Sequence, residues 1–183
     1  MKSAMLSIKP QYCELIASGK KTIELRKSRP KIETPFKCYI YECNWKNNSF
    51  YAYKHKGKLG KVIGEFVCKN ISVYPYFDDG YSVSYGYVTI TDKTLKKMCL
   101  DLHEIEDYGN CKKIYGWHIS DLIIYDNPKE LSEFRKPCPH GENISCYSCE
   151  KAGYNDFFED SNIRCLNFLK TIPQSWYYVQ EVI

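Results

Sequence analysis

Residues 19–26 read Gly-Lys-Lys-Thr-Ile-Glu-Leu-Arg, and they predict the end of a helix followed by a strand with charged side chains. Glycine readily ends a helix because it adopts backbone conformations that other residues avoid. The residues after it alternate, so Ile23 and Leu25 face one side of a predicted strand while Glu24 and Arg26 face the other. The two charged side chains would then lie about 7 Å apart. Either they serve a function, or they form a surface ion pair that contributes little stability.

The segments around this stretch predict a domain in which strands outnumber helices. Alternating and β-branched runs predict strands over 4–9, 21–26, 36–43, 61–73, 115–125 and 175–182. Capping residues and helical spacing predict helices over 10–18, 92–100 and 102–108, the last ended by Gly109. Because strands outnumber helices and most connections are short, we expect an α+β fold. It would consist of a small mixed or antiparallel β-barrel with short helices at its rim.

Composition narrows the class of protein. The 183 residues contain no apolar run near the ~20 needed to span a bilayer, and the first ten are too interrupted for a signal peptide. We therefore expect a cytoplasmic protein without membrane association. Residues 1–69 carry fifteen Lys/Arg and five Asp/Glu, a balance of +10, whereas residues 70–183 carry a balance of −6. The basic part predicts an anionic partner such as nucleic acid, with a solvated lysine-rich surface as the alternative.

Ten cysteines occur in the chain. A reducing compartment argues against a disulfide framework, and most of them fit as small buried side chains. The cysteines of residues 137–165 have a different interpretation from the others. They form a C-x-x-C pair with flanking Cys and His, which is the spacing of a structural zinc site. The candidate ligands are Cys138, His140, Cys146, Cys149 and Cys165. Bound zinc would explain how a segment with few apolar residues stays ordered. The alternative is that these cysteines are ordinary thiols that bind no metal.

Residues 7–26 resemble the ASCH domain family. The resemblance rests on Ser7-Ile8-Lys9-Pro10, on Tyr12 and Ile16, and on the G-x-K-x-x-E-x-R pattern of residues 19–26. It extends to Tyr115-Gly116-Trp117-His118-Ile119-Ser120 and to Pro173-Gln174-Ser175-Trp176, which look like a phage- and prophage-associated bacterial branch.

ASCH domains are similar in fold to PUA domains, so the resemblance implies a small β-barrel with flanking helices and a cleft beside residues 19–26. We expect residues 1–136 to form this barrel. Residues 137–165 would be a Cys-rich insertion, and residues 166–183 a final helix and strand that complete the barrel.

The resemblance also implies that the cleft binds RNA or a nucleotide-like ligand. The expected binding residues are Lys9, Lys21, Glu24 and Arg26. Lysine and arginine would hold a phosphate or a base edge, and the carboxylate would accept a hydrogen bond from an amine. Aromatic residues of two later strands could stack on bases or pack in the core. These aromatic candidates are Trp117 and Trp176. His118, which follows Trp117, could act as an acid or base or make a structural hydrogen bond.

A second hypothesis places hydrolysis of a modified nucleoside or of RNA in the same cleft. One branch of the family hydrolyses the amide of acetylated cytidine with a lysine, a threonine and a glutamate, and another has been linked to RNA cleavage. Lys21 matches the lysine, but Glu24 stands where the first branch has threonine, so its nucleophile is missing. The third residue would fall near Glu104 or Asp107. An enzyme would use Glu24 as base and Lys21 to stabilise charge.

A third hypothesis makes the chain an interaction module of a mobile element. Residues 137–165 would then be its contact surface. Binding is favoured over catalysis, because the threonine of the one well-defined chemistry is absent.

Overall fold

The computed structural model describes residues 3–43, 58–78, 85–87, 89–137, 169 and 174–181. The five candidate zinc ligands, Cys138, His140, Cys146, Cys149 and Cys165, all lie outside these ranges. Within the described ranges, no helix is long and apolar enough to cross a membrane.

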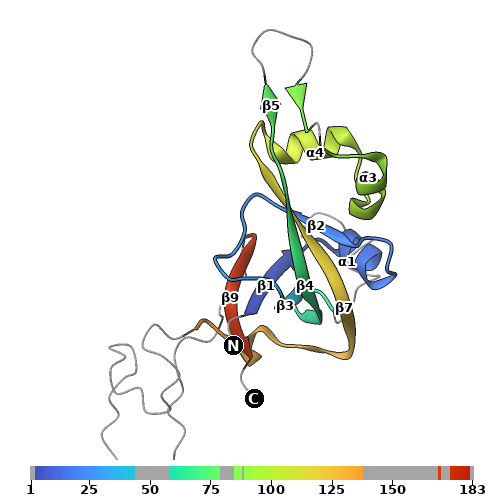
Figure 1. Cartoon of the computed structure of the whole chain (residues 1–183). Coiled ribbons are helices and arrows are strands. Elements are labelled where there is room, and N and C mark those ends of the chain that lie inside the picture. Colours follow the sequence, from blue (N-terminus) through green and yellow to red (C-terminus); the bar gives the residue numbers. More distant parts are fainter. Residues whose placement is uncertain are drawn as a thin grey trace, which may run out of the picture.

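The main element of the described chain is one seven-stranded mixed sheet (Figure 1). Its strands, in spatial order, are β2 (Ile23–Arg26), β7 (Ile114–Lys129), β4 (Val62–Tyr74), β3 (Phe36–Glu42), β1 (Ser3–Ile8), β9 (Trp176–Glu181) and β8 (Phe134–Arg135). The pairing of β1 with β3 is parallel, and the other described pairings are antiparallel. A separate ladder joins β5 (Phe77–Asp78) to β6 (Tyr85–Gly86).

Short helices connect or flank these strands. The described ones are α1 (Pro10–Ala17), α3 (Asp92–Met98), α4 (Leu102–Gly109) and the 3-10 helix η1 (Leu131–Glu133). Proline suits the first turn of α1 because its ring fixes φ near the helical value and its missing N–H is not needed there. Asp101 and Glu104 begin α4 with a capping box, in which each side chain accepts a hydrogen bond from the backbone N–H of the other.

The sheet curls, so that its first edge approaches its middle. Three strands separate β2 from β1 in the hydrogen-bonded order, which in a flat sheet would hold them roughly 19 Å apart. Nevertheless, Nη2 of Arg26 in β2 donates a hydrogen bond to the carbonyl oxygen of Ser7 in β1 at 2.9 Å. The sheet therefore bends round on itself, although no described ladder joins β1 to β2, and closure into a barrel stays a prediction.

Strand β2 is buried on both faces, which explains its unusual environment. On one face, Ile23 and Leu25 pack with Met98 and Ile105 of the helices α3 and α4. On the other face, Glu24 lies opposite Trp117 of β7, the largest fully buried side chain of the main core. A strand between a helical layer and a curled sheet has no solvent-exposed face, so even its charged residues are buried.

The α+β class and the mixed sheet are confirmed, and the strand bounds agree within a few residues. The prediction that β7 ends at residue 125 is wrong, because it continues to Lys129 along β4 through several register shifts. The helix predicted over 102–108 is confirmed to within one residue, because Gly109 is the last residue of α4. The left-handed C-cap residue, with a φ of 50°, is Asn110 and not the glycine. A Cβ atom at Gly109 would overlap the Tyr87 hydroxyl, which explains the glycine.

Candidate functional site

The turn after α1 delivers residues 21–26 to the sheet. Gly19 has a φ of +72°, and its N–H donates to the carbonyl oxygen of Ile16 at 2.8 Å. This left-handed conformation suits glycine, since a side chain would strain it. The N–H of Lys21 then donates to the carbonyl oxygen of Leu15 at 2.9 Å, which fixes the start of the functional segment against the helix.

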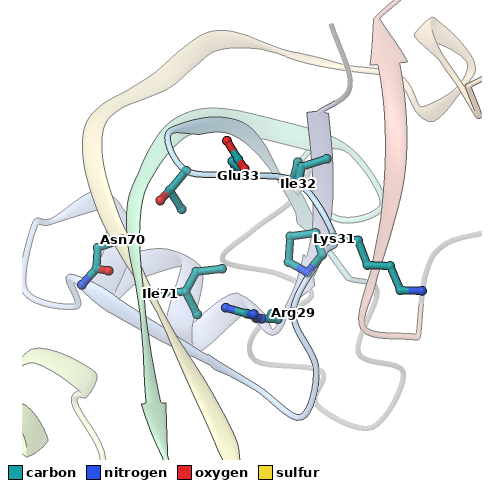
Figure 2. A pocket seen from close by; sticks show the side chains of 8 residues that line it. Arg29, Lys31, Ile32, Glu33, Asn70 and Ile71 are labelled. Atoms are coloured by element: carbon teal, nitrogen blue, oxygen red, sulfur yellow. The ribbon is translucent and has the colours of Figure 1, made fainter.

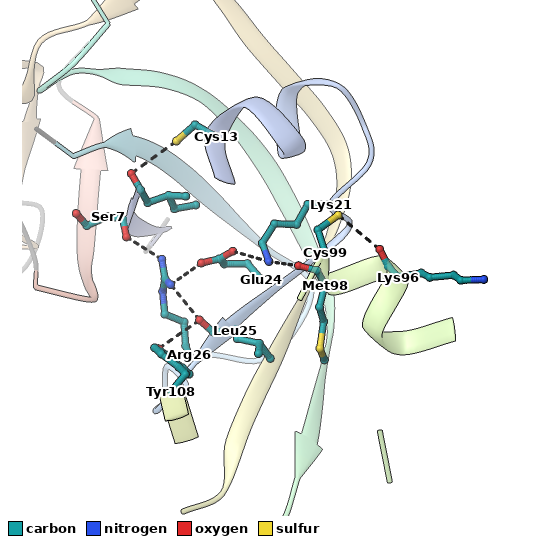
Figure 3. Close-up of polar contacts among 11 residues, drawn as sticks. Ser7, Cys13, Lys21, Glu24, Leu25, Arg26, Lys96, Met98, Cys99 and Tyr108 are labelled. Atoms are coloured by element: carbon teal, nitrogen blue, oxygen red, sulfur yellow. Dashed lines mark hydrogen bonds and ion pairs between the residues drawn. The ribbon is translucent and has the colours of Figure 1, made fainter. Parts of the chain in front are cut away.

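The Lys21 side chain is held by the end of a helix that lies far away in sequence. Its Nζ donates to the carbonyl oxygen of Met98, the last residue of α3 (Figure 3). The last carbonyls of a helix lack intrahelical partners and carry partial negative charge, so an ammonium group there is favourable. The same Nζ lies 5.0 Å from the centre of the Tyr12 ring, which adds a cation–π contact.

Glu24 lies between the two cations (Figure 3). Its Oε1 accepts a hydrogen bond from Nη1 of Arg26 at 2.5 Å, and its Oε2 lies 3.5 Å from Nζ of Lys21. The Arg26 guanidinium also donates to the carbonyl oxygens of Leu25 at 3.0 Å and Ser7 at 2.9 Å. These backbone contacts fix the position of the guanidinium, so the three side chains form one preorganised network, here called the inner cluster.

The inner cluster is buried. The exposed fractions of the Lys21, Glu24 and Arg26 side chains are 1%, 6% and 8%. The interpretation of Glu24 and Arg26 as a surface ion pair is therefore wrong. Two cations and one carboxylate leave an excess of one positive charge where solvent screening is weak.

The inner cluster forms part of the wall of a cleft with a volume of about 710 Å³. Ionisable side chains from several elements line this cleft. The cations are Lys9, Lys21, Arg26 and Lys27. The carboxylates are Glu24, Glu104 and Asp107. The cations and Glu24 come from the segment around α1 and β2, whereas Glu104 and Asp107 come from α4.

Two tyrosines also line the cleft and carry aromatic surface into it. Burial, followed by the charge of Glu104, raises the pKa of Tyr12. The pKa of Tyr108 is raised mainly by burial, which outweighs the opposing effect of Arg26. Both rings therefore stay neutral at physiological pH and offer a face for packing and a hydroxyl for hydrogen bonding.

The other candidate residues do not line the cleft, although Trp117 is the direct ladder partner of Glu24. Trp117 is fully buried, with Phe36 and Trp176 against it at centroid distances of 5.6 and 5.8 Å. His118, its neighbour on β7, faces the opposite side of the sheet, where Nε2 lies 2.8 Å from Oγ of Ser72. Burial, and then the charge of Lys97, lowers the pKa of His118. None of these three candidates, Trp117, His118 and Trp176, is among the residues that line the cleft.

Sequence reasoning missed several parts of the cleft. Tyr108 and Cys43 line it, although neither was expected there. The Met98 carbonyl that holds Lys21 is a backbone atom and has no sequence signal of its own. The placement of Glu104 and Asp107 beside the inner cluster agrees with the region to which the resemblance pointed.

Comparisons with known proteins agree with this architecture. A crystal structure of ASCH from Zymomonas mobilis superposes with a TM-score of 0.51 at 20% identity, covering 70% of this chain and 73% of that one. Two single-substitution variants of the Zymomonas mobilis protein superpose with TM-scores of 0.50 at 20% and 21% identity, covering 72% and 70% of this chain and 77% and 74% of theirs. No curated protein matches the chain. The family model of the ASCH domain matches residues 6–113, which is more than half of the sequence, and the chain therefore belongs to the ASCH domain family.

Proposed function

We propose that this ASCH domain binds RNA or a nucleotide-like ligand in the cleft lined by the inner cluster. The observation that carries the proposal is the excess of one positive charge on three buried side chains, Lys21, Glu24 and Arg26. A buried cation without a matching anion is costly, and a phosphate or another anionic ligand group would supply the missing charge. Membership of a PUA-like family supports RNA as the source of that group.

The inner cluster also has unused hydrogen-bonding capacity. Within the described part of the chain, Nε of Arg26 and Oε2 of Glu24 have no hydrogen-bond partner. We assign Arg26 and Lys21 to a phosphate or a base edge, and Glu24 to an amine of the base. The exposed Lys9 and Lys27 at the same cleft would attract the anionic ligand.

The test measures binding of short single-stranded RNA over a range of salt concentrations. Lys21→Met and Arg26→Ala should each weaken binding about 10- to 100-fold, since each removes a charge-assisted contact. Lys93→Ala is the matched control, because this exposed lysine of α3 lines neither this cleft nor the cavity described below. Unchanged affinity in the two cleft variants, with a folded protein by circular dichroism, would refute the proposal.

Hydrolysis of a modified nucleoside or of RNA is a second candidate function. It is favoured by one observation, which is that Glu104 and Asp107 line the same cleft as Lys21 and Glu24. Two carboxylates that line one cleft could supply an acid and a base to a bound ligand. A panel of modified nucleosides and short RNAs tests it: turnover should be lost in Glu24→Gln. Absence of turnover, or turnover that survives this substitution, would contradict catalysis.

Zinc binding by residues 137–165 is a separate proposal, supported by the C-x-x-C spacing of Cys146 and Cys149. We expect about one equivalent of zinc in the purified protein, and loss of that metal in Cys146→Ser. Less than one equivalent after mild purification would contradict it. A role of this segment as the contact surface of an interaction module, the assignment to a phage- and prophage-associated branch, and the division at residues 136 and 165 stay predictions.

A further inference from the structure

A second cavity lies beneath the loop that connects β2 to β3. Its volume is about 800 Å³, and residues 29–34 of the loop line it together with Asn70 and Ile71 of β4 (Figure 2). None of these residues takes part in the inner cluster or lines the cleft. The cavity therefore needs an explanation of its own.

Strand β9 fastens this loop at two points. Nε1 of Trp176 donates a hydrogen bond to Oγ of Ser28 at 2.9 Å. The N–H of Lys31 donates to the Tyr178 hydroxyl at 2.6 Å. Between these points Pro30 is buried. A loop attached in this way holds the cavity open before any ligand arrives, which reduces the entropic cost of binding.

The cavity combines the surfaces that a nucleotide requires. Its apolar part consists of Pro30, Ile32 and Ile71, against which the face of a base can pack. Asn70 offers an amide at the wall, which can pair with a base edge. In Figure 2 the Arg29 side chain extends in the direction of Ile71, and both residues line the cavity.

The charge of this cavity also suits a phosphate. Arg29, Lys31 and Glu33 give it an excess of one positive charge. Among the described residues, no ion pair engages the side chain of Arg29 or Lys31, and both residues are exposed. Their positive charges therefore remain available to an anion from solution.

The second cavity adjoins the cleft. Lys27 and Ser28 line the cleft, and the next residue, Arg29, lines the second cavity. In the sheet, Glu24 pairs with Trp117, and Trp117 pairs with Ile71. Directly paired residues point to the same face of a sheet, so Glu24 of the cleft and Ile71 of the second cavity lie on one face with Trp117 between them.

We propose that the second cavity is a nucleotide subsite next to the cleft, and that the ligand is single-stranded RNA of two or more nucleotides. This inference rests on the proposed function. One nucleotide occupies the cleft at the inner cluster. Its neighbour crosses Lys27 and Ser28 and places its base against Ile71, with its phosphate at Arg29.

The experiment compares fluorescence anisotropy of a labelled mononucleotide with that of a labelled octanucleotide. We expect the octanucleotide to bind at least tenfold more tightly. Arg29→Ala should remove most of this gain and reduce the salt dependence by about one phosphate contact, while leaving the mononucleotide affinity unchanged. Asn70→Ala removes the amide at the cavity wall without changing charge and should reduce the gain as well. Lys93→Ala again serves as the matched charge control.

The outcomes separate the two proposals. Equal binding of both ligands, or a length gain that survives both Arg29→Ala and Asn70→Ala, overturns the subsite and leaves the cleft proposal standing. An equal loss in Lys93→Ala would attribute the effect to overall charge and would also overturn the subsite. Absence of binding of either ligand at low salt overturns both proposals.

Discussion

Two clusters of lysine and glutamate lie on the same sheet, and they differ in what they leave unsatisfied. The inner cluster, Lys21, Glu24 and Arg26, lines the cleft with one excess positive charge. The second, here called the outer cluster, consists of Lys37 of β3, Glu65 of β4 and Tyr125 of β7. It lines neither of the two cavities described above.

In the outer cluster, both oxygens of the Glu65 carboxylate have hydrogen-bond partners within the cluster. Oε1 of Glu65 accepts a hydrogen bond from Nζ of Lys37 at 2.8 Å, and Oε2 accepts one from the Tyr125 hydroxyl at 2.5 Å. Burial pushes the pKa of Glu65 upward, but the hydrogen bonds from Lys37 and Tyr125 outweigh it, and the pKa is lowered. Burial, and then the hydrogen bond to Glu65, raises the pKa of Tyr125.

The outer cluster has the features of a structural ion pair, whereas the inner cluster has those of a candidate ligand site. In the outer cluster both oxygens of the Glu65 carboxylate are hydrogen-bonded, and the charge of Lys129 acts on it in addition to that of Lys37. In the inner cluster two cations face one carboxylate, and one oxygen of Glu24 lacks a hydrogen bond within the described residues. The residue types are alike, so burial and hydrogen-bond satisfaction indicate the function more clearly than residue identity does.

The largest expected difference concerns the two carboxylates. Glu24→Gln leaves Lys21 and Arg26 as two buried cations without a counter-charge, which should lower the free energy of unfolding by about 3–5 kcal/mol. Glu65→Gln should cost only about 1 kcal/mol, because the Lys37 side chain is 40% exposed and water can replace the lost contact. Urea unfolding at neutral pH measures both.

A double variant provides the control for the inner cluster. Adding Lys21→Met to Glu24→Gln removes one of the two uncompensated cations and should recover part of the lost stability. If Glu24→Gln costs no more than Glu65→Gln, then the charges of the inner cluster are screened, and the comparison between the clusters fails.

A smaller effect is expected from the pH dependence of the outer cluster. The pKa of Glu65 is lowered in the folded protein, so this residue binds protons more weakly there than in the unfolded chain. Its contribution to stability is present above the unfolded pKa, near 4.5, and is lost as the pH falls through the lower folded pKa. Unfolding midpoints between pH 7 and pH 3 should therefore fall less steeply in Glu65→Gln than in the parent protein. Parallel curves would show that Glu65 is not stabilised by its partners.

The smallest expected effect comes from Tyr125→Phe. The substitution removes one hydrogen bond to a carboxylate that Lys37 still engages, so the free energy of unfolding should fall by about 1 kcal/mol or less. Affinity for RNA should not change, since the outer cluster lies outside both cavities. A variant that folds as stably as the parent but binds RNA more weakly would show that the outer cluster contributes to the ligand site.

Much of the fold could be predicted because its signals are local. Alternation predicted which residues of β2 share a face, and Pro10 predicted the start of α1. The environment of β2 could not be predicted in the same way. The Lys21 side chain donates to the carbonyl of Met98, 77 residues away in the sequence. Arg26 of β2 donates to the carbonyl of Ser7 in β1, although three strands lie between β2 and β1 in the sheet.

The sequence by itself determined the order of the longer strands and of α1, α3 and α4, the charged face of β2 and the resemblance to the ASCH family, because periodicity and short motifs lie in neighbouring residues. The two-residue strands β5, β6 and β8 had no such signal. Only the tertiary structure decided that Lys21, Glu24 and Arg26 are buried together and that residues 29–34 line a second cavity. Burial and charge balance depend on packing between segments distant in sequence. The backbone carbonyls that fix these side chains have the same chemistry in every residue, so only the fold could identify them.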